Sequence, residues 1–86
     1  MHFDLHRAFI KKFIKLTPKL RKRFKERKNL FLETPSHPIL NNHALQGDRA
    51  GQWSINITGD LRAVYIFRGE TTILFVDIDT HSNLYR

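Results

Sequence analysis

Apolar residues in the first third of the chain recur at the spacing of an amphipathic helix. From about Arg7 they return every three or four residues while lysines take the opposite side; the apolar set is Phe9, Ile10, Phe13 and Ile14. Thr17 and Pro18 then indicate a break, because threonine caps a helix start and proline suits the first helical position. The pattern predicts one helix from about Arg7 and a second from Pro18 to about Glu33.

Alternating apolar and polar residues dominate the second half of the chain. Such alternation is typical of strands, and it covers residues 53–57, 61–67 and 71–79. Glycine-containing segments at 58–60 and 68–70 separate these runs and are expected to be turns. In the last run the alternation predicts two faces, one with Leu74, Val76 and Ile78 and the other with Phe75, Asp77 and Asp79.

The elements follow the order β-α-α-β-β-β, with a short first strand at 2–5 and a loop at 34–42. Short connections between the last three strands predict an antiparallel meander. Helices grouped at one end and strands at the other are typical of the α+β class. We expect a single domain over residues 1–86, with two N-terminal helices packed on a small antiparallel β-sheet and Trp53 in its core.

Positive charge is concentrated in the helical part of the chain. The formal net charge is +7, and residues 1–33 hold eleven of the fifteen Lys and Arg with only three acidic residues. Residues 34–86 hold four basic and five acidic residues and are close to neutral. Such a block is typical of a nucleic-acid-binding protein or of one with an acidic partner, although a basic run can also be a solvated helix face.

Several kinds of site and location are disfavoured. The chain has no cysteine, its histidines lack the spacing of a helical zinc site, and it has no Gly-rich phosphate loop. The pair Asp77 and Asp79 is more often a solvated strand edge than a magnesium site, so we expect neither metal nor cofactor. No apolar run is long enough to span a membrane and no signal-type segment is evident, so we expect a cytoplasmic protein without a membrane partner.

Four motifs stand in a fixed order in the second half of the chain. They are His43-Ala-Leu-Gln-Gly47, Gly51-Gln-Trp-Ser-Ile55, Gly59-Asp-Leu-Arg-Ala-Val-Tyr65 and Asp79-Thr-His-Ser-Asn-Leu-Tyr85. Together with the basic helices before them, these motifs resemble the RelE/ParE toxin superfamily, and most closely its YafQ-like branch. The resemblance implies a small antiparallel sheet with two N-terminal helices. It also implies metal-independent cleavage of messenger RNA on the ribosome, in which a ribose 2′-hydroxyl attacks the adjacent phosphate.

The resemblance assigns roles to particular residues. His81 matches the C-terminal catalytic histidine and His43 an upstream one, and both are acid/base candidates because imidazole titrates near neutral pH. Asp60 matches an acidic residue that orients a histidine or the RNA, and Arg62 matches an arginine used on the scissile phosphate. Tyr85 matches an aromatic residue that stacks on a base. Further RNA contacts are expected from basic residues, namely Arg49, Lys11, Lys12, Lys15 and Lys22.

Each of these residues also has a simpler interpretation. Asp60 suits a hairpin turn after Gly59, and His81 suits a turn after a strand. The others can be a cap of the loop, an exposed strand residue and a C-terminal packing anchor, for His43, Arg62 and Tyr85 in that order. The chain departs from the branch at Asp77, where an arginine is common, and at Asn56, where some members have a histidine. A negative charge at Asp77 is expected to repel the scissile phosphate and to raise the pKa of His81.

The resemblance leaves two other functions open. One is the gyrase poisoning of ParE-type relatives, and the other is a non-catalytic module that only binds RNA or an antitoxin. As partners it implies a cognate antitoxin, the ribosome with its mRNA, and operator DNA bound through the antitoxin complex.

Overall fold

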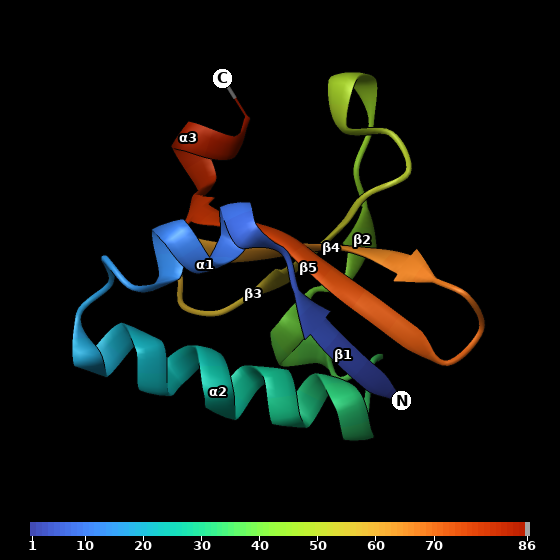
Figure 1. Ribbon diagram of the computed structural model, residues 1–86, viewed down its shortest axis with the longest axis horizontal. Coiled ribbons are helices and arrows are strands. Elements are labelled where there is room, and N and C mark those ends of the chain that lie inside the picture. Colours follow the sequence, from blue (N-terminus) through green and yellow to red (C-terminus); the bar gives the residue numbers. More distant parts are fainter. Residues whose placement is uncertain (86) are drawn as a thin grey trace.

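The computed structural model describes residues 1–85 and confirms the α+β class (Figure 1). Its helices are α1 (Arg7–Phe13), α2 (Pro18–Glu33) and α3 (His81–Leu84), with short 3-10 turns at Pro38–Leu40 and Gly47–Arg49. Its strands are β1 (His2–Leu5), β2 (His43–Ala44), β3 (Trp53–Asn56), β4 (Leu61–Arg68) and β5 (Thr72–Thr80). Both predicted helices and all four predicted strands are present, and the sequence analysis missed β2 and α3.

The break between the first two helices is built as the sequence predicts. The Thr17 hydroxyl accepts a hydrogen bond from the Leu20 N–H at 3.3 Å, and Pro18 is the first residue of α2. The helix α1 is capped by His6, whose Nδ1 accepts from the Ala8 N–H at 3.0 Å. Each cap satisfies a backbone donor that has no partner inside the helix, so both helix starts are set locally.

The sheet has the order β1-β5-β4-β3-β2. The strands β2 to β5 are antiparallel to their neighbours, which confirms the meander, but β1 pairs with β5 in parallel. The prediction of a purely antiparallel sheet was therefore wrong in this one pairing. The reason is that β1 and β5 are separated along the chain by both helices and three other strands, so no tight turn sets their relative direction as it does within the meander.

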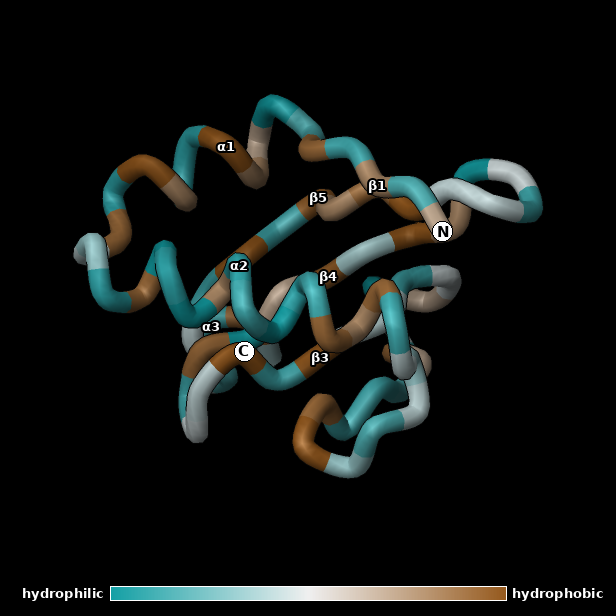
Figure 2. Tube along the Cα trace, turned by 90° about the horizontal axis from the view of Figure 1, so that it is seen from below, coloured by the Kyte–Doolittle hydropathy of each residue, from teal (hydrophilic) through white to brown (hydrophobic). Residues whose placement is uncertain are grey.

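The helix α2 covers one face of the sheet, while α3 and the segment after β2 rise from the other (Figure 1). The face under α2, here the inner face, carries the larger core cluster, and its ring contacts centre on Phe75. Viewed from the α2 side, most of the α2 trace is hydrophilic, and its few apolar segments lie against the strands (Figure 2). The outward surface of α2 is therefore strongly basic.

A β-bulge changes which residues of β5 face the core. Tyr65 pairs with Phe75 and Val64 with Asp77, so Val76 has no partner in β4. The extra residue shifts the alternation, and Phe75 and Ile78 both join the inner cluster. The predicted faces were therefore wrong, because Val76 packs with the smaller cluster on the other face and Asp77 does not share the face of Phe75.

The strand β3 is more buried than a half-buried strand should be. Ser54 is fully buried and its hydroxyl has no hydrogen-bond partner within residues 1–85. The segment that follows β2 explains this, because Leu45 packs with Val64 and Leu84 on the same side of the sheet. The expected exposed polar face of residues 53–57 was thus wrong at Ser54, whereas Trp53 packs against the core as predicted.

Candidate functional site

The face of the sheet turned away from α2, here the outer face, gathers most of the residues singled out in the sequence. Residues paired across neighbouring strands lie on the same face. One row across the sheet runs His43, Ser54, Val64, Asp77, and the next runs Asn56, Arg62, Asp79. The helix α3 continues directly from the end of β5, so it places His81 and Tyr85 at the end of these rows.

His81 and Asp60 are brought together by backbone contacts. The His81 N–H donates to the Asp60 carbonyl at 2.8 Å, which ties α3 to the turn between β3 and β4. The Thr80 hydroxyl caps α3 by accepting from the Asn83 N–H at 3.3 Å. Within residues 1–85 neither the His81 imidazole nor the Asp60 carboxylate is hydrogen-bonded, and both residues are exposed. Both groups are free to meet a substrate.

Arg62 follows Asp60 by two residues and pairs with Asp79, two residues before His81. Its Nη1 donates to the Thr58 carbonyl at 3.0 Å and to the Leu61 carbonyl at 3.3 Å, which fixes the guanidinium over the turn. Its Nη2 and Nε make no hydrogen bond within residues 1–85, so that side of the planar fork can take two phosphate oxygens. The residue is half-buried, which limits its motion.

The structure does not bring His43 into contact with His81. The strands β2 and β5 lie three positions apart in the sheet, so their backbones are about 14 Å apart at ordinary strand spacing. The Nδ1 of His43 lies 2.8 Å from the Asn41 carbonyl, an acceptor, so this nitrogen carries the proton. The Nε2 of the neutral ring is then the proton acceptor.

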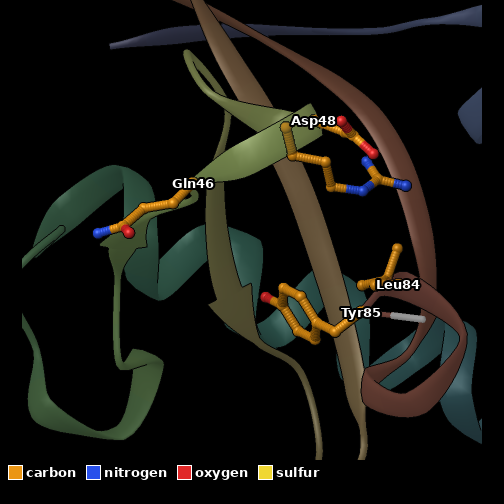
Figure 3. A pocket seen from close by; sticks show the side chains of 5 residues that line it. Gln46, Asp48, Leu84 and Tyr85 are labelled. Atoms are coloured by element: carbon orange, nitrogen blue, oxygen red, sulfur yellow. The ribbon is translucent and has the colours of Figure 1, made fainter.

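A cavity of about 450 Å³ opens between the segment after β2 and α3. The segment after β2 supplies Gln46, Asp48 and Arg49, and the C-terminal segment supplies Leu84 and Tyr85 (Figure 3). The Tyr85 ring is 4.6 Å from the His81 ring, centroid to centroid, so the cavity adjoins the histidine. Sequence reasoning missed Gln46 and Asp48, although both lie in or directly after the first motif.

Asp77 joins three elements through ion pairs. Its carboxylate lies 2.8 Å from the Lys12 Nζ of α1 and 2.8 Å from the Arg49 Nη2. Lys12 also contacts Asp79 at 3.0 Å, and Arg49 Nη1 donates to the Gln52 amide oxygen at 2.9 Å. The interpretation of the two aspartates as solvated edge residues was therefore wrong, because each has a cationic partner.

Two cations offset the charge that Asp77 adds to the outer face. Burial by itself raises the pKa of the Asp77 carboxyl, but hydrogen bonds from Lys12 and Arg49 outweigh it and hold that pKa below its ordinary value of 3.8. The Asp77 carboxylate in turn raises the pKa of the Lys12 ammonium above 10.5. The expected repulsion between Asp77 and a phosphate is thereby reduced. The positive charges of Lys12 and Arg49 are in turn partly neutralised by their ion pairs with Asp77.

Replacing Asp77 by asparagine is expected to destabilise the fold by about 1–2 kcal/mol, because two cations lose their partner. The pKa of Asp77 is lower in the folded chain than in the unfolded chain. The stabilisation from its ion pairs is therefore fully present above about pH 4, and it is lost as the pH falls through the pKa of the folded state. Urea unfolding of both proteins from pH 3 to pH 8 measures this. Asp4→Asn is the control, since its ion pair with Arg68 is exposed on both sides. Equal losses in the two variants would contradict the expectation.

The other basic candidates lie outside the cavity. Lys11 and Lys15 are exposed on and after α1, and Lys22 is exposed on α2, across the sheet from the cavity. Within the described chain, no three His, Cys, Asp or Glu side chains are grouped closely enough to hold a metal ion. No helix among these residues is long and apolar enough to cross a membrane.

Solved structures share this architecture. The YoeB/ParE toxin from Agrobacterium tumefaciens is 20% identical, with a TM-score of 0.77 over 94% of this chain and 99% of that one. YafQ from E. coli is 19% identical, with a TM-score of 0.76 over 98% and 97%. The E. coli DinJ–YafQ toxin–antitoxin complex matches at 20% identity and 0.74 over 98% and 96%. No protein-family model and no curated protein sequence matches the chain.

The chain therefore has the fold of the RelE/ParE toxin superfamily, and its likeness extends over nearly the whole of both chains. The resemblance expected from the four sequence motifs, including that to YafQ, is confirmed at the level of the fold.

Proposed function

We propose that this chain is the toxin of a toxin–antitoxin system and cleaves messenger RNA on the ribosome without a metal. The observation that carries the proposal is the end of the outer face, where the free imidazole of His81 lies against the Tyr85 ring that lines the cavity, and the half-free guanidinium of Arg62 lies on the neighbouring strand β4. The fold shared with YafQ, which forms a toxin–antitoxin complex with DinJ, supports it.

These side chains suit the transfer of a phosphoryl group within RNA. The ribose 2′-oxygen attacks the adjacent phosphorus, a 2′,3′-cyclic phosphate forms, and the bond to the 5′-oxygen of the next nucleotide breaks. One base takes the 2′-proton and one acid gives a proton to the leaving oxygen, and His81 performs one of these steps. Arg62 stabilises the charge on the phosphorus centre, and Tyr85 stacks on a base.

His43 and Asp60 have supporting roles in this proposal. The Nε2 of His43 is a proton acceptor, and a substrate spanning the outer face would lie between it and His81. The Asp60 backbone carbonyl accepts from the His81 N–H, and the exposed carboxylate of Asp60 orients either the imidazole or the RNA. Arg49, Lys11, Lys12, Lys15 and Lys22 add positive charge for the RNA.

Under this proposal the basic toxin acts in the cytoplasm and binds an acidic partner protein, its antitoxin. The antitoxin would cover the outer face with acidic or amphipathic segments, and the pair would bind its operator DNA through the antitoxin.

Expression of the chain in bacteria tests the function. We expect growth arrest together with new mRNA ends in primer extension, and we expect both to vanish in His81→Ala. His2→Ala is the matched control, because His2 pairs with Thr72 at the opposite end of β5. Arrest that persists in His81→Ala without mRNA cleavage would contradict the ribonuclease, and relaxed plasmid DNA in those cells would favour gyrase poisoning. No arrest would favour a binding-only module.

A further inference from the structure

A second cavity lies beside the turn that joins β3 to β4. It has a volume of about 300 Å³ and lies between this turn and α2. We call it the arginine pocket, and it is lined by Arg23, Arg27, Ile39, Asn56, Ile57, Thr58 and Gly59. Arg23, Arg27 and Ile39 were not singled out from the sequence.

The two arginines carry positive charge that the protein does not neutralise. Arg23 and Arg27 lie one helical turn apart on α2, a spacing at which like charges repel by about 0.2–0.5 kcal/mol. Both are partly buried, which weakens their hydration. Within residues 1–85 neither forms an ion pair, not even with Glu26 of the same helix or Asp60 of the turn.

Few of their hydrogen-bond donors are used. Arg27 makes one long bond, from its Nε to the Ile57 carbonyl at 3.4 Å, and Arg23 makes none within the described chain. The pocket therefore lacks an anion for its guanidinium groups.

A phosphodiester of RNA supplies this anion, because its phosphate matches the planar fork of arginine, which favours bidentate contact with two oxygens.

The turn connects this pocket to the candidate active site. Thr58 lines the pocket with its neighbours, and its carbonyl accepts the hydrogen bond from Arg62. Two residues later the Asp60 carbonyl accepts from the His81 N–H. An RNA strand that leaves His81 and Arg62 along this turn meets Arg23 and Arg27 next.

We propose that the arginine pocket binds a phosphodiester of the same RNA strand whose scissile phosphate lies at His81 and Arg62. The inference rests on the proposed function and extends it, because it adds a second contact on the α2 side of the protein. It predicts that RNA length matters. A dinucleotide can fill only the active site, whereas an RNA of about ten nucleotides is long enough to reach both sites.

The test uses RNA with 2′-O-methyl groups, which cannot be cleaved, and measures binding to the full chain by fluorescence anisotropy at several salt concentrations. For the long RNA we expect Arg23→Gln to weaken binding about tenfold, as for loss of one charged contact, and to lower the salt slope by about 0.7. For the dinucleotide we expect no change. Lys25→Gln is the matched control, because Lys25 is exposed on the same helix and does not line the pocket.

Arg23 is the cleaner variant because, unlike Arg27, it forms no hydrogen bond or ion pair within residues 1–85. Thermal unfolding checks that both variants remain folded. Equal affinities of Arg23→Gln and Lys25→Gln for the long RNA would overturn the pocket, as would a wild-type chain that binds no RNA. If Arg23→Gln weakens the binding of an acidic peptide but not that of RNA, the proposal is also overturned, and the pocket is assigned to a protein partner.

The two proposals can fail separately. If the wild-type chain cleaves RNA and Arg23→Gln does not change the binding of long RNA, the proposed function is retained and the RNA-binding role of the pocket is rejected. If the wild-type chain cleaves no mRNA but binds long RNA more tightly than Arg23→Gln does, the RNA-binding role of the arginine pocket is supported and the nuclease function is rejected.

Discussion

Replacing His81 by alanine is expected to lower the rate of mRNA cleavage by about 10²–10⁴-fold, the usual contribution of a positioned acid or base. The imidazole is exposed, adjoins the cavity next to Tyr85 and has no hydrogen bond within residues 1–85. Its loss therefore removes the proton transfer without removing a contact that holds the fold. The helix α3 itself depends on Thr80 and on the backbone of His81, which alanine retains.

Single-turnover cleavage on purified, mRNA-programmed ribosomes measures this rate, with His2→Ala as the control. A substrate whose leaving 5′-oxygen is replaced by sulfur then separates acid from base, since a thiolate leaves without being protonated. If His81 is the acid, the variant recovers most of its rate on this substrate. If His81 is the base, the deficit remains and His43 is the next residue to test as the acid. An unchanged rate with the normal substrate would show that His81 takes no part.

Replacing Phe75 by alanine is expected to destabilise the fold by about 3–5 kcal/mol, the usual cost of removing a fully buried phenylalanine. Phe75 has no exposed surface, and its ring contacts five others, at centroid distances from 5.2 Å to 6.4 Å. These rings come from β1, α1, α2 and β4, so one side chain holds both helices on the sheet. Domains of this size have a total stability of roughly 5–15 kcal/mol, so the variant is expected to be near its unfolding limit.

Urea unfolding followed by circular dichroism measures the loss. Phe67→Ala serves as the comparison, because Phe67 is 54% exposed near the end of β4 and, within residues 1–85, its ring pairs with the two rings of Trp53 and Tyr65. We expect it to lose about 1 kcal/mol or less. Similar losses at the two positions would show that the aromatic cluster does not centre on Phe75.

The helices and strands followed from the sequence because their causes are local. The capping threonine and the proline of α2 act on residues next to them in the chain. The alternation of apolar and polar residues in β3 and β4 arises because successive side chains of a strand point to opposite faces of the sheet. The four motifs likewise pointed to the fold through their order, which the solved structures bear out. The short helix α3 escaped prediction because one turn of helix has too few residues for a periodic pattern.

The electrostatics of the site depended on residues that are distant in sequence. Lys12 and Asp79 are 67 positions apart, yet their side chains meet because α1 packs beside β5. Nothing in the segment around Asp77 indicates that Lys12 and Arg49 will pair with it. Its charge was therefore predicted as a repulsion, when the folded chain supplies two counterions.

The sequence by itself thus determined most helices and strands, their order, the basic character of the helices and the histidine at the end of β5, because each of these features depends on local residue spacing or composition. Only the tertiary structure decided the bulge at Val76, the separation of His43 from His81, and the arginine pocket beside the β3–β4 turn. The physical reason is that strand register and helix docking are selected by the packing of the whole core, which no local pattern contains.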